Sequence, residues 1–238
     1  MIELRGLSKS YGNKKAVDQL TLEVPAGMVV ALLGPNGAGK TTTIRAITGL
    51  TRPSSGSAWV CGVNVWDQPV KAKALIGYIP DRPYLYGKLT ARELLRFVSG
   101  IRGASAEPKI QNWLDFFDLS DFGSALVESF SHGMRQKLTI IAALLADPPV
   151  LVVDEPMVGL DPQAAKQVRD LMVERARKGY TVLLTTHSME LAEAISGQVA
   201  VLDHGRLVAS GQVEELKRQT QGSTLEDVFF RLLAEEAQ

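Results

Sequence analysis

The segment from residue 34 to residue 42 constrains the fold of this chain more than any other part of the sequence. It reads Gly34, Pro35, Asn36, Gly37, Ala38, Gly39, Lys40, Thr41 and Thr42. An apolar run, 28–33, precedes it and a helical pattern, 40–48, follows it, which is the strand–loop–helix setting of a P-loop. Polyphosphate requires several backbone N–H groups at close range, and glycines allow that approach. The segment therefore predicts a phosphate-binding turn.

Two side chains of this segment extend the prediction from phosphate to a metal-bound nucleotide. Lys40 places a point charge where it can reach the outer phosphates, and Thr41 offers a hydroxyl to Mg²⁺. A glycine-rich turn with a solvated lysine is the alternative. It would explain two of these features but not the spacing, the lysine, the hydroxyl and the strand–helix context together.

Apolar runs that recur along the chain predict the architecture around this turn. The runs 28–33, 150–153, 181–185 and 198–202 are apolar on consecutive positions, as in strands buried on both faces of a sheet. Helical segments separate them, and one begins with Asp161 and Pro162 and stops at Gly179. We expect a doubly wound α/β core of the P-loop NTPase (RecA-like) type.

Two other regions depart from this alternation. Alternating apolar residues between 2 and 24, interrupted around Gly12 and Asn13, predict an N-terminal antiparallel β subdomain. Residues 85–147 lose the strand signal, and a Thr90–Glu93 capping box opens a helix there. We therefore divide one domain, 1–238, into a core with its β subdomain (1–84 and 148–214), an inserted α-helical subdomain (85–147) and an amphipathic helical tail (215–238).

Adjacent carboxylates follow the second buried run. Asp154 and Glu155 end the apolar stretch 150–153, and buried charges are costly unless they meet a cation. Alternation along the strand would let Asp154 face Mg²⁺ while Glu155 polarises an attacking water. A helix N-cap pair is the alternative, but Pro156 and Gly159 delay the next helix until Asp161.

His187 ends the apolar run that starts at Thr181, which places it at the same sheet edge as Asp154. A lone histidine is usually a capping or packed residue. Because other parts of a phosphoryl-transfer site end on that edge, we favour a role in positioning water or transition-state charge.

Composition limits the setting in which this chemistry takes place. Lys plus Arg number 26 and Asp plus Glu number 26, so no overall field attracts nucleic acid or an anionic bilayer. The single Cys61 excludes an internal disulfide, fits a reducing compartment and is predicted to be a small buried residue. The N-terminus does not resemble a secretory signal, and the longest apolar stretch, Ile140–Ala146, is too short to span a membrane.

These motifs in this order, with the segment Phe130–Gln136 before the second carboxylate strand, resemble the ABC ATPases. The signature segment and the loop Gly159–Asp161 separate that family from other P-loop proteins. The resemblance implies two subunits placed head to tail, with Ser131, His132 and Gly133 at the γ-phosphate held by the P-loop of a second copy. It also implies that Tyr11 stacks on adenine, with Val17 nearby. Ser131 is expected to cap the helix that follows, to about Leu145.

Two positions depart from the family pattern. Asp81 stands where the family has glutamine, and could still ligate Mg²⁺ with more charge and a shorter reach. The signature reads Ser-His-Gly-Met from Ser131, where the common form is Ser-Gly-Gly-Gln. A basic residue at His132 and the tail segment 225–229 resemble the subgroup that serves ABC-2-type export permeases.

The resemblance predicts an ATPase that uses ATP and Mg²⁺ and powers transport, with export favoured, through an integral membrane permease on a separate chain. ATP binding would close a homodimer at the cytoplasmic face of the membrane, and hydrolysis would reopen it. The alternatives are a soluble ABC ATPase acting on nucleic acid or ribosomes, a non-hydrolysing ATP-dependent regulatory module, and a GTPase or small-molecule kinase. Lys40→Ala is expected to weaken nucleotide binding, and Glu155→Gln to abolish turnover while binding persists.

Overall fold

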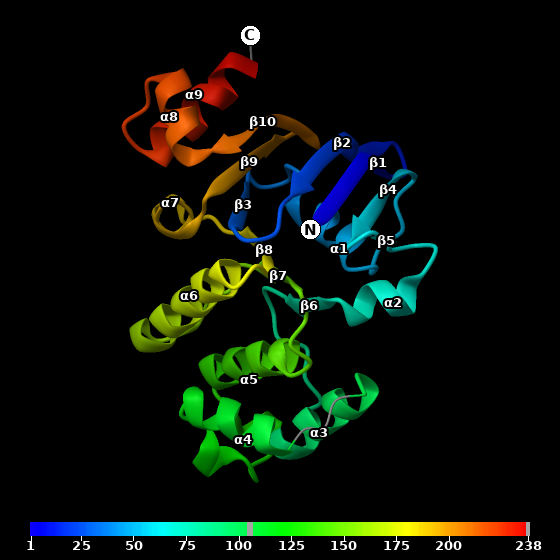
Figure 1. Cartoon of the computed structure of the whole chain (residues 1–238), viewed down its shortest axis with the longest axis vertical. Coiled ribbons are helices and arrows are strands. Elements are labelled where there is room, and N and C mark those ends of the chain that lie inside the picture. Colours follow the sequence, from blue (N-terminus) through cyan, green and yellow to red (C-terminus); the bar gives the residue numbers. More distant parts are fainter. Residues whose placement is uncertain (104–106, 237–238) are drawn as a thin grey trace.

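A computed structural model describes residues 1–103 and 107–236 of the chain, and contains two β-sheets and the helices around them (Figure 1). The strands are β1 (Ile2–Tyr11), β2 (Lys14–Val24), β3 (Val29–Leu33), β4 (Ser55–Val60), β5 (Val63–Asn64), β6 (Ile76–Ile79), β7 (Val150–Asp154), β8 (Thr181–Thr185), β9 (Gln198–Asp203) and β10 (Arg206–Gln212). The α-helices are α1 (Lys40–Ile47), α2 (Pro69–Ala74), α3 (Ala91–Ile101), α4 (Glu107–Phe116), α5 (His132–Leu144), α6 (Pro162–Arg177), α7 (Met189–Ile195), α8 (Val213–Thr220) and α9 (Leu225–Glu236).

The larger sheet has the strand order β10-β9-β3-β8-β7-β6. Strands β9, β3, β8, β7 and β6 run parallel, and β10 pairs antiparallel with β9 at the edge. Every residue of β3, β7 and β8 is buried, because helices cover one face and the second sheet with α1 covers the other. This is the parallel arrangement that the consecutive apolar runs predict, and the strand ends that must carry the functional side chains meet at one edge.

Alternation along these strands divides the apolar residues between the two faces. Leu151 and Val153 join the cluster formed with α5 and α6, whereas Val150 and Val152 join the cluster formed with β1, β2 and α1. A third cluster packs β9 against the tail helices. The sheet therefore lies in the middle of a layered core, and its register is fixed from both sides.

The smaller sheet, of order β2-β1-β4-β5, is antiparallel and confirms the predicted N-terminal antiparallel unit. β1 and β2 are joined at Gly12 and Asn13, where Tyr11 pairs with Lys14. Gly12 has a φ of 56°, which glycine adopts without steric cost. The turn brings Tyr11 and the start of β2 to the edge where α1 begins, as the next subsection describes.

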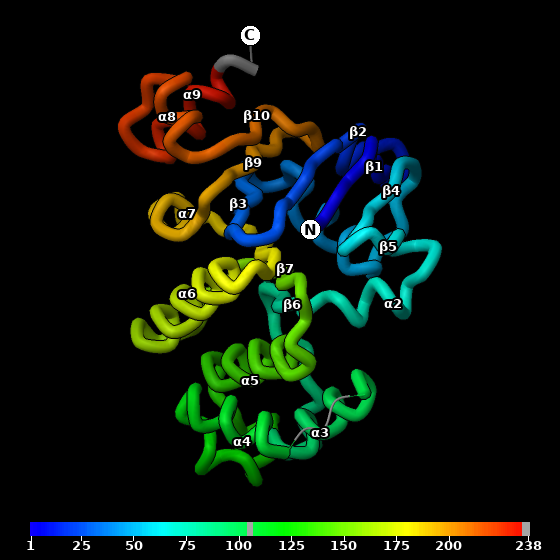
Figure 2. Tube along the Cα trace, viewed as in Figure 1, coloured from blue at the N-terminus to red at the C-terminus, as the bar shows by residue number. Residues whose placement is uncertain are grey.

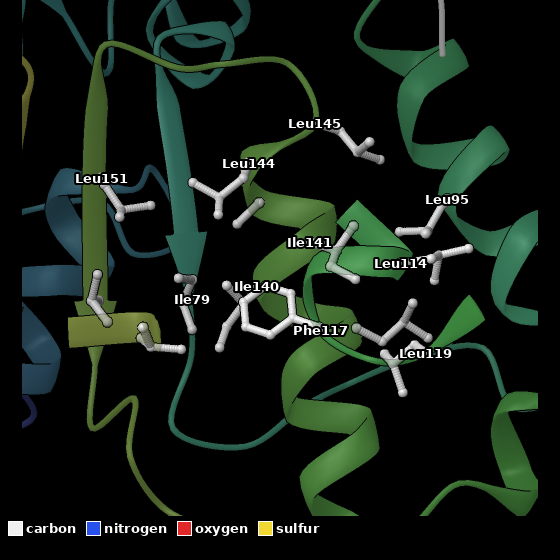
Figure 3. Packing of buried hydrophobic residues seen from close by; sticks show 14 of the residues in the cluster. Ile79, Leu95, Leu114, Phe117, Leu119, Ile140, Ile141, Leu144, Leu145 and Leu151 are labelled. Carbon is white, nitrogen blue, oxygen red and sulfur yellow. The ribbon is translucent and has the colours of Figure 1, made fainter. Parts of the chain in front are cut away.

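Helices α3, α4 and α5 lie at the opposite end of the molecule from the C-terminal helices α8 and α9 (Figures 1 and 2). Thr90 caps α3, and the reciprocal bond from Glu93 completes the expected capping box. Phe117 and Leu114 lie among Ile140, Ile141 and Leu144 of α5, and the cluster continues to Ile79 and Leu151 of the sheet (Figure 3). The helices thus share one core with the strands, and residues 104–106 of this region lie outside the described residues.

The C-terminal segment forms two helices, α8 and α9, rather than one. Gln221 has a φ of 55° and Gly222 follows it, so the chain turns between them, and α9 packs on α7, α8 and β10. Glu193 of α7 joins the two helices: it pairs with Lys217 Nζ at 2.5 Å and accepts a hydrogen bond from Leu225 N at 2.8 Å. Residues 237–238 of the predicted tail lie outside the described residues.

The prediction for Cys61 was wrong, because this residue is exposed. It occupies the turn between β4 and β5 with a φ of 48°, followed by Gly62 at 77°. A strand position would have directed the thiol inward, but a tight turn directs it to solvent. In the described ranges, 1–103 and 107–236, no helix is both long and apolar enough to cross a bilayer.

Candidate functional site

A cleft of about 370 Å³ opens where β3, β7 and β8 end. Most of the residues that line it are ones that the sequence predicts, and the fold gathers them from five separate segments. The lining residues are Tyr11, Lys14, Ala16, Asn36, Gly37, Ala38, Gly39, Lys40, Thr41, Thr42, Asp81, Asp154, Glu155 and His187.

The turn from β3 to α1 is held so closely by its surroundings that glycine is required at two positions. A Cβ on Gly34 would lie 2.3 Å from the carbonyl oxygen of Leu202, and one on Gly39 would lie 2.4 Å from that of Ala16. Both glycines also have positive φ angles, 155° and 105°. The backbone of the turn is therefore fixed against β9 and β2, with its N–H groups at the N-terminus of α1.

Lys40 begins α1 and is buried. Its Nζ donates to the carbonyl oxygens of Gly34 at 2.6 Å and Pro35 at 3.1 Å. Gly34 and Pro35 do not line the cleft, but their carbonyl groups hold the Lys40 ammonium there. Burial lowers the pKa of Lys40, while Glu155 and Asp154 act in the opposite direction. The ammonium is thus held at the cleft by neutral carbonyls, and an anion in the cleft would supply the missing countercharge.

Asp154 is the last residue of β7 and is buried. Its Oδ1 accepts a hydrogen bond from the hydroxyl of Thr185, the residue beside it in the register of β7 and β8. Burial raises the pKa of Asp154 although this hydrogen bond acts to lower it. A cation in the cleft would stabilise the ionised carboxylate.

Glu155 reaches the cleft by a different route from the one predicted. Strand alternation does not direct its side chain, because the strand ends at Asp154 and Glu155 has a φ of 49°. Its Oε1 has no hydrogen-bond partner among the residues that the structure describes, and it lies 3.4 Å from Nε2 of His187. Burial raises the pKa of Glu155, which the charge of His187 acts to lower. A buried carboxylate oxygen without a donor is suited to accept a proton from water.

His187 lies two residues beyond the end of β8, just before Ser188 caps α7. Its side chain is more than half exposed, so it is not the packed histidine of the alternative interpretation. The structure brings it into the same cleft as Asp154 and Glu155.

The cleft also accepts the chemistry of Mg²⁺ bound to a nucleotide. Within the described residues, no group of three or more His, Cys, Asp or Glu side chains could hold a metal ion by itself. Mg²⁺ is commonly held by one or two carboxylates together with phosphate oxygens and water. Thr41, Asp154 and Asp81 line the cleft and supply oxygen ligands of this kind, with Asp81 about half exposed.

Tyr11 and Val17 occupy different positions relative to the cleft. Tyr11 lines it and is half exposed, with Lys9 Nζ over its ring at 5.1 Å from the centroid, and a tyrosine ring is suited to stacking on a flat ligand. Val17 is fully buried, and its side chain would lie 3.3 Å from a Cβ on Gly39. Val17 therefore packs against Gly39 of the phosphate turn and does not line the cleft.

Ser131, His132 and Gly133 do not line this cleft. Ser131 is the N-cap of α5, and its Oγ accepts a hydrogen bond from Met134 N at 3.2 Å, as the sequence predicts. Ser131 and His132 are exposed. The helix N-terminus is therefore open to an anion from outside the chain, and the chain's own phosphate turn is elsewhere.

Comparison with known proteins identifies the group to which this site belongs. The family model described as "ABC transporter" matches residues 17–158, which contain the phosphate turn, the signature and both carboxylates. The chain belongs to the ABC transporter family. A solved structure described as the ATP binding subunit of an ABC transporter shares 35% sequence identity with it at a TM-score of 0.93, covering 98% of this chain and 99% of that one.

Curated members of the ABC transporter family are similar to this chain over most of its length. The Nod factor export ATP-binding protein I of Cupriavidus metallidurans is 38% identical over 96% of this chain and 77% of its own length. The daunorubicin/doxorubicin resistance ATP-binding protein DrrA of Streptomyces peucetius is 39% identical over 100% of this chain and 71% of its own. The resemblance inferred from the sequence is thereby confirmed, as is the P-loop NTPase fold. As a member of this family the chain is an ATPase, for which ATP and Mg²⁺ are the cofactors.

Three residues at the site of this ABC ATPase were missed from the sequence. Lys14 and Ala16 line the cleft beside Tyr11, and their position directly after the Gly12–Asn13 turn was the available signal. Thr185 orients Asp154; it ends an apolar run parallel to the carboxylate strand, which could have suggested the contact.

Proposed function

We propose that this chain is the ATP-hydrolysing subunit that powers transport across a membrane through a separately encoded permease, with export as the direction. The observation that carries the proposal is one cleft that contains a buried lysine, a glycine-held phosphate turn and the acidic pair Asp154 and Glu155, with His187 beside it. The names of these two relatives refer to export and to drug resistance, which supports the direction.

Each side chain has a distinct task in this proposal. Lys40 and the backbone N–H groups of the turn hold the phosphates, and Tyr11 stacks on the base. Asp154, oriented by Thr185, would hold Mg²⁺ with Thr41 and Asp81. Bound Mg²⁺ neutralises charge on the phosphates. Glu155 accepts the proton of the attacking water, and His187 at 3.4 Å holds the carboxylate and the developing charge in place.

A second copy of the chain completes the site. The exposed N-terminus of α5, with Ser131, His132 and Gly133, lies outside the chain's own cleft and is able to hold phosphate. We propose that each signature turn contacts the γ-phosphate in the cleft of its partner. A solved ATP-binding cassette, 24% identical with a TM-score of 0.81, is described as dimeric with ADP and Pi bound, and it supports the fold on which this arrangement depends.

The helical region offers a surface for the permease. Tyr86, Phe97 and Ile101 are exposed by 65%, 49% and 71%, and Tyr86 contacts Phe97 edge to face. Exposed apolar patches of this kind mark interaction sites. We propose that residues 85–147 form the subdomain that passes closure to the permease, that the core is 1–84 with 148–214, and that 215–238 is a separate tail. The chain would then be peripheral at the cytoplasmic face of the membrane.

Phosphate release by purified wild-type protein and by Glu155→Gln tests the proposal. We expect turnover to fall by about 100-fold or more, because the amide cannot accept the proton, while ATP affinity is retained. Because bound ATP then persists, the variant should sediment as a dimer in MgATP and as a monomer without it. Normal turnover in Glu155→Gln would remove Glu155 from catalysis, and wild-type protein that binds ATP without releasing phosphate, even with its permease, would favour the regulatory module.

A further inference from the structure

His132 packs directly against the loop that follows Glu155. A Cβ added to Gly159 would lie 2.0 Å from Cδ2 of His132 and 2.7 Å from its Nε2. Atoms cannot approach this closely, so the imidazole ring already occupies the space that any side chain at Gly159 would need. Gly159 has a φ of 80°, and its backbone forms the surface on which the ring lies.

Three other residues of α5 contact the same loop. A Cβ on Gly133 would lie 2.6 Å from the carbonyl oxygen of Gly159. Gln136 Nε2 donates to the Pro156 carbonyl oxygen at 3.4 Å, and Lys137 Nζ lies 3.3 Å from Asp161 Oδ2. Positions four residues apart share one face of a helix. One face of α5 therefore holds the loop 156–161 near both ends, and His132 holds it near the middle.

The position of this loop bears on the side chain of Glu155. Val158 N donates to the Glu155 carbonyl oxygen at 3.5 Å, and Leu160 N donates to that of Met157 at 3.2 Å. Glu155 itself has a left-handed backbone, which is unfavourable for a residue with a Cβ and persists only when the surroundings impose it. A shift of the loop would release this conformation and move the carboxylate away from His187.

We propose that His132 is a positioning residue for hydrolysis: its ring packs on Gly159, holds the loop 156–161 and so keeps Glu155 directed into the cleft. It acts through Gly159 and touches no reacting group in the cleft of its own chain. A glycine at position 132 has no ring and could not make this contact with Gly159. The inference rests on the proposed function, because its readout is ATP hydrolysis.

A double-mutant cycle between residues 132 and 159 tests the contact. Gly159→Ala is expected to lower kcat by about tenfold, because the new methyl group displaces the ring and the loop with it. Gly179→Ala is the matched control: Gly179 has a φ of 89° and nothing within 4 Å of an added Cβ, so it carries the backbone strain without the clash. Adding His132→Gly to Gly159→Ala should bring kcat back only to that of His132→Gly alone, about fivefold below the wild type, because the methyl group then meets no ring.

Two outcomes of this cycle would overturn the proposal. One is a Gly159→Ala protein as active as Gly179→Ala, and the other is a double variant no faster than Gly159→Ala alone. Thermal melts confirm that each variant folds, and the loss should fall on kcat more than on the KM for ATP, since the contact orients Glu155 within the same chain.

A second pair of variants decides the question if Gly159→Ala does not fold. His132→Phe keeps a ring on Gly159, whereas His132→Ala removes it. We expect His132→Phe to keep a kcat several-fold higher than that of His132→Ala, because only the phenyl ring can still pack on Gly159. Equal loss in both would assign the histidine to a polar contact with phosphate and refute the packing role. Absence of hydrolysis in the wild-type protein would instead contradict the proposed function itself.

Discussion

The strands that end at the cleft are buried along their whole length, whereas the signature turn Ser131–Gly133 is half-buried to exposed at the end of a helix. At the cleft, burial shifts the pKa of Lys40, Asp154 and Glu155 by more than the opposite charges beside them offset, and a metal-bound nucleotide would add further opposite charge. At the signature turn, Ser131 caps the helix with an ordinary hydrogen bond. The difference agrees with the proposal that the cleft binds the nucleotide by itself and that the signature turn acts on nucleotide already bound to a second copy.

Lys40→Ala gives the largest expected effect and tests whether the cleft is self-sufficient. Removal of the buried ammonium should weaken MgATP binding to the isolated chain by about 50-fold or more, because charge-assisted contacts to phosphate are lost. Calorimetric titration measures it. Lys71→Ala is the control, because Lys71 is an exposed lysine on α2 whose side chain is hydrogen-bonded to that of Gln68. This variant should bind MgATP as the wild type does. An equal loss in both variants would show a general charge effect.

Ser131→Ala should separate the two regions, with a smaller effect. We expect turnover to fall about tenfold while the affinity of the isolated chain for MgATP stays within about twofold. Loss of the N-cap should also lower the free energy of unfolding by about 1 kcal/mol. Thr90→Ala removes the N-cap of α3 and is the control for that loss of stability. We expect it to leave ATP hydrolysis by the isolated protein unchanged. If Ser131→Ala weakened nucleotide binding as much as Lys40→Ala, the comparison would fail.

The same contrast explains what the sequence could predict. The phosphate turn and the buried strands were predictable because their residues are neighbours in the chain and their periodicity is local. The caps at Thr90, Ser131 and Asp161 were predictable for the same reason.

The remainder depends on contacts between distant segments or on backbone angles that the sequence does not display. Thr185 orients Asp154 across two strands, and His132 meets Gly159 across two elements. Glu155 owes its direction to a left-handed backbone instead of strand alternation, and Cys61 is exposed because it lies in a turn with positive φ. A pattern along one segment cannot report either kind of feature.

The smallest expected effects are changes in stability at two aspartates, Asp154 in the cleft and Asp161 at the N-cap of α6. These two changes should have opposite signs. Burial raises the pKa of Asp154, so its ionised form costs folding free energy in the empty cleft at neutral pH. Asp154→Asn should therefore raise the Tm of the nucleotide-free protein by about 2 °C at pH 7. This gain should shrink as the pH falls through the raised pKa and be gone below the ordinary 3.8, where the carboxyl is neutral in both the folded and the unfolded chain.

Asp161 behaves in the opposite way, because it caps α6 beside the signature helix. The N–H of Ala164, and then Lys137, lower its pKa below the ordinary 3.8. Its carboxylate thus contributes stability above pH 3.8, and the contribution is lost as the pH falls through the lowered value. Since asparagine also caps helices, Asp161→Asn should cost less than about 0.5 kcal/mol near pH 7 and nothing in strong acid. Melting curves of both variants and the wild type across this range measure the two signs, and shifts in the same direction would mean that the cleft carboxylate is solvated like the cap.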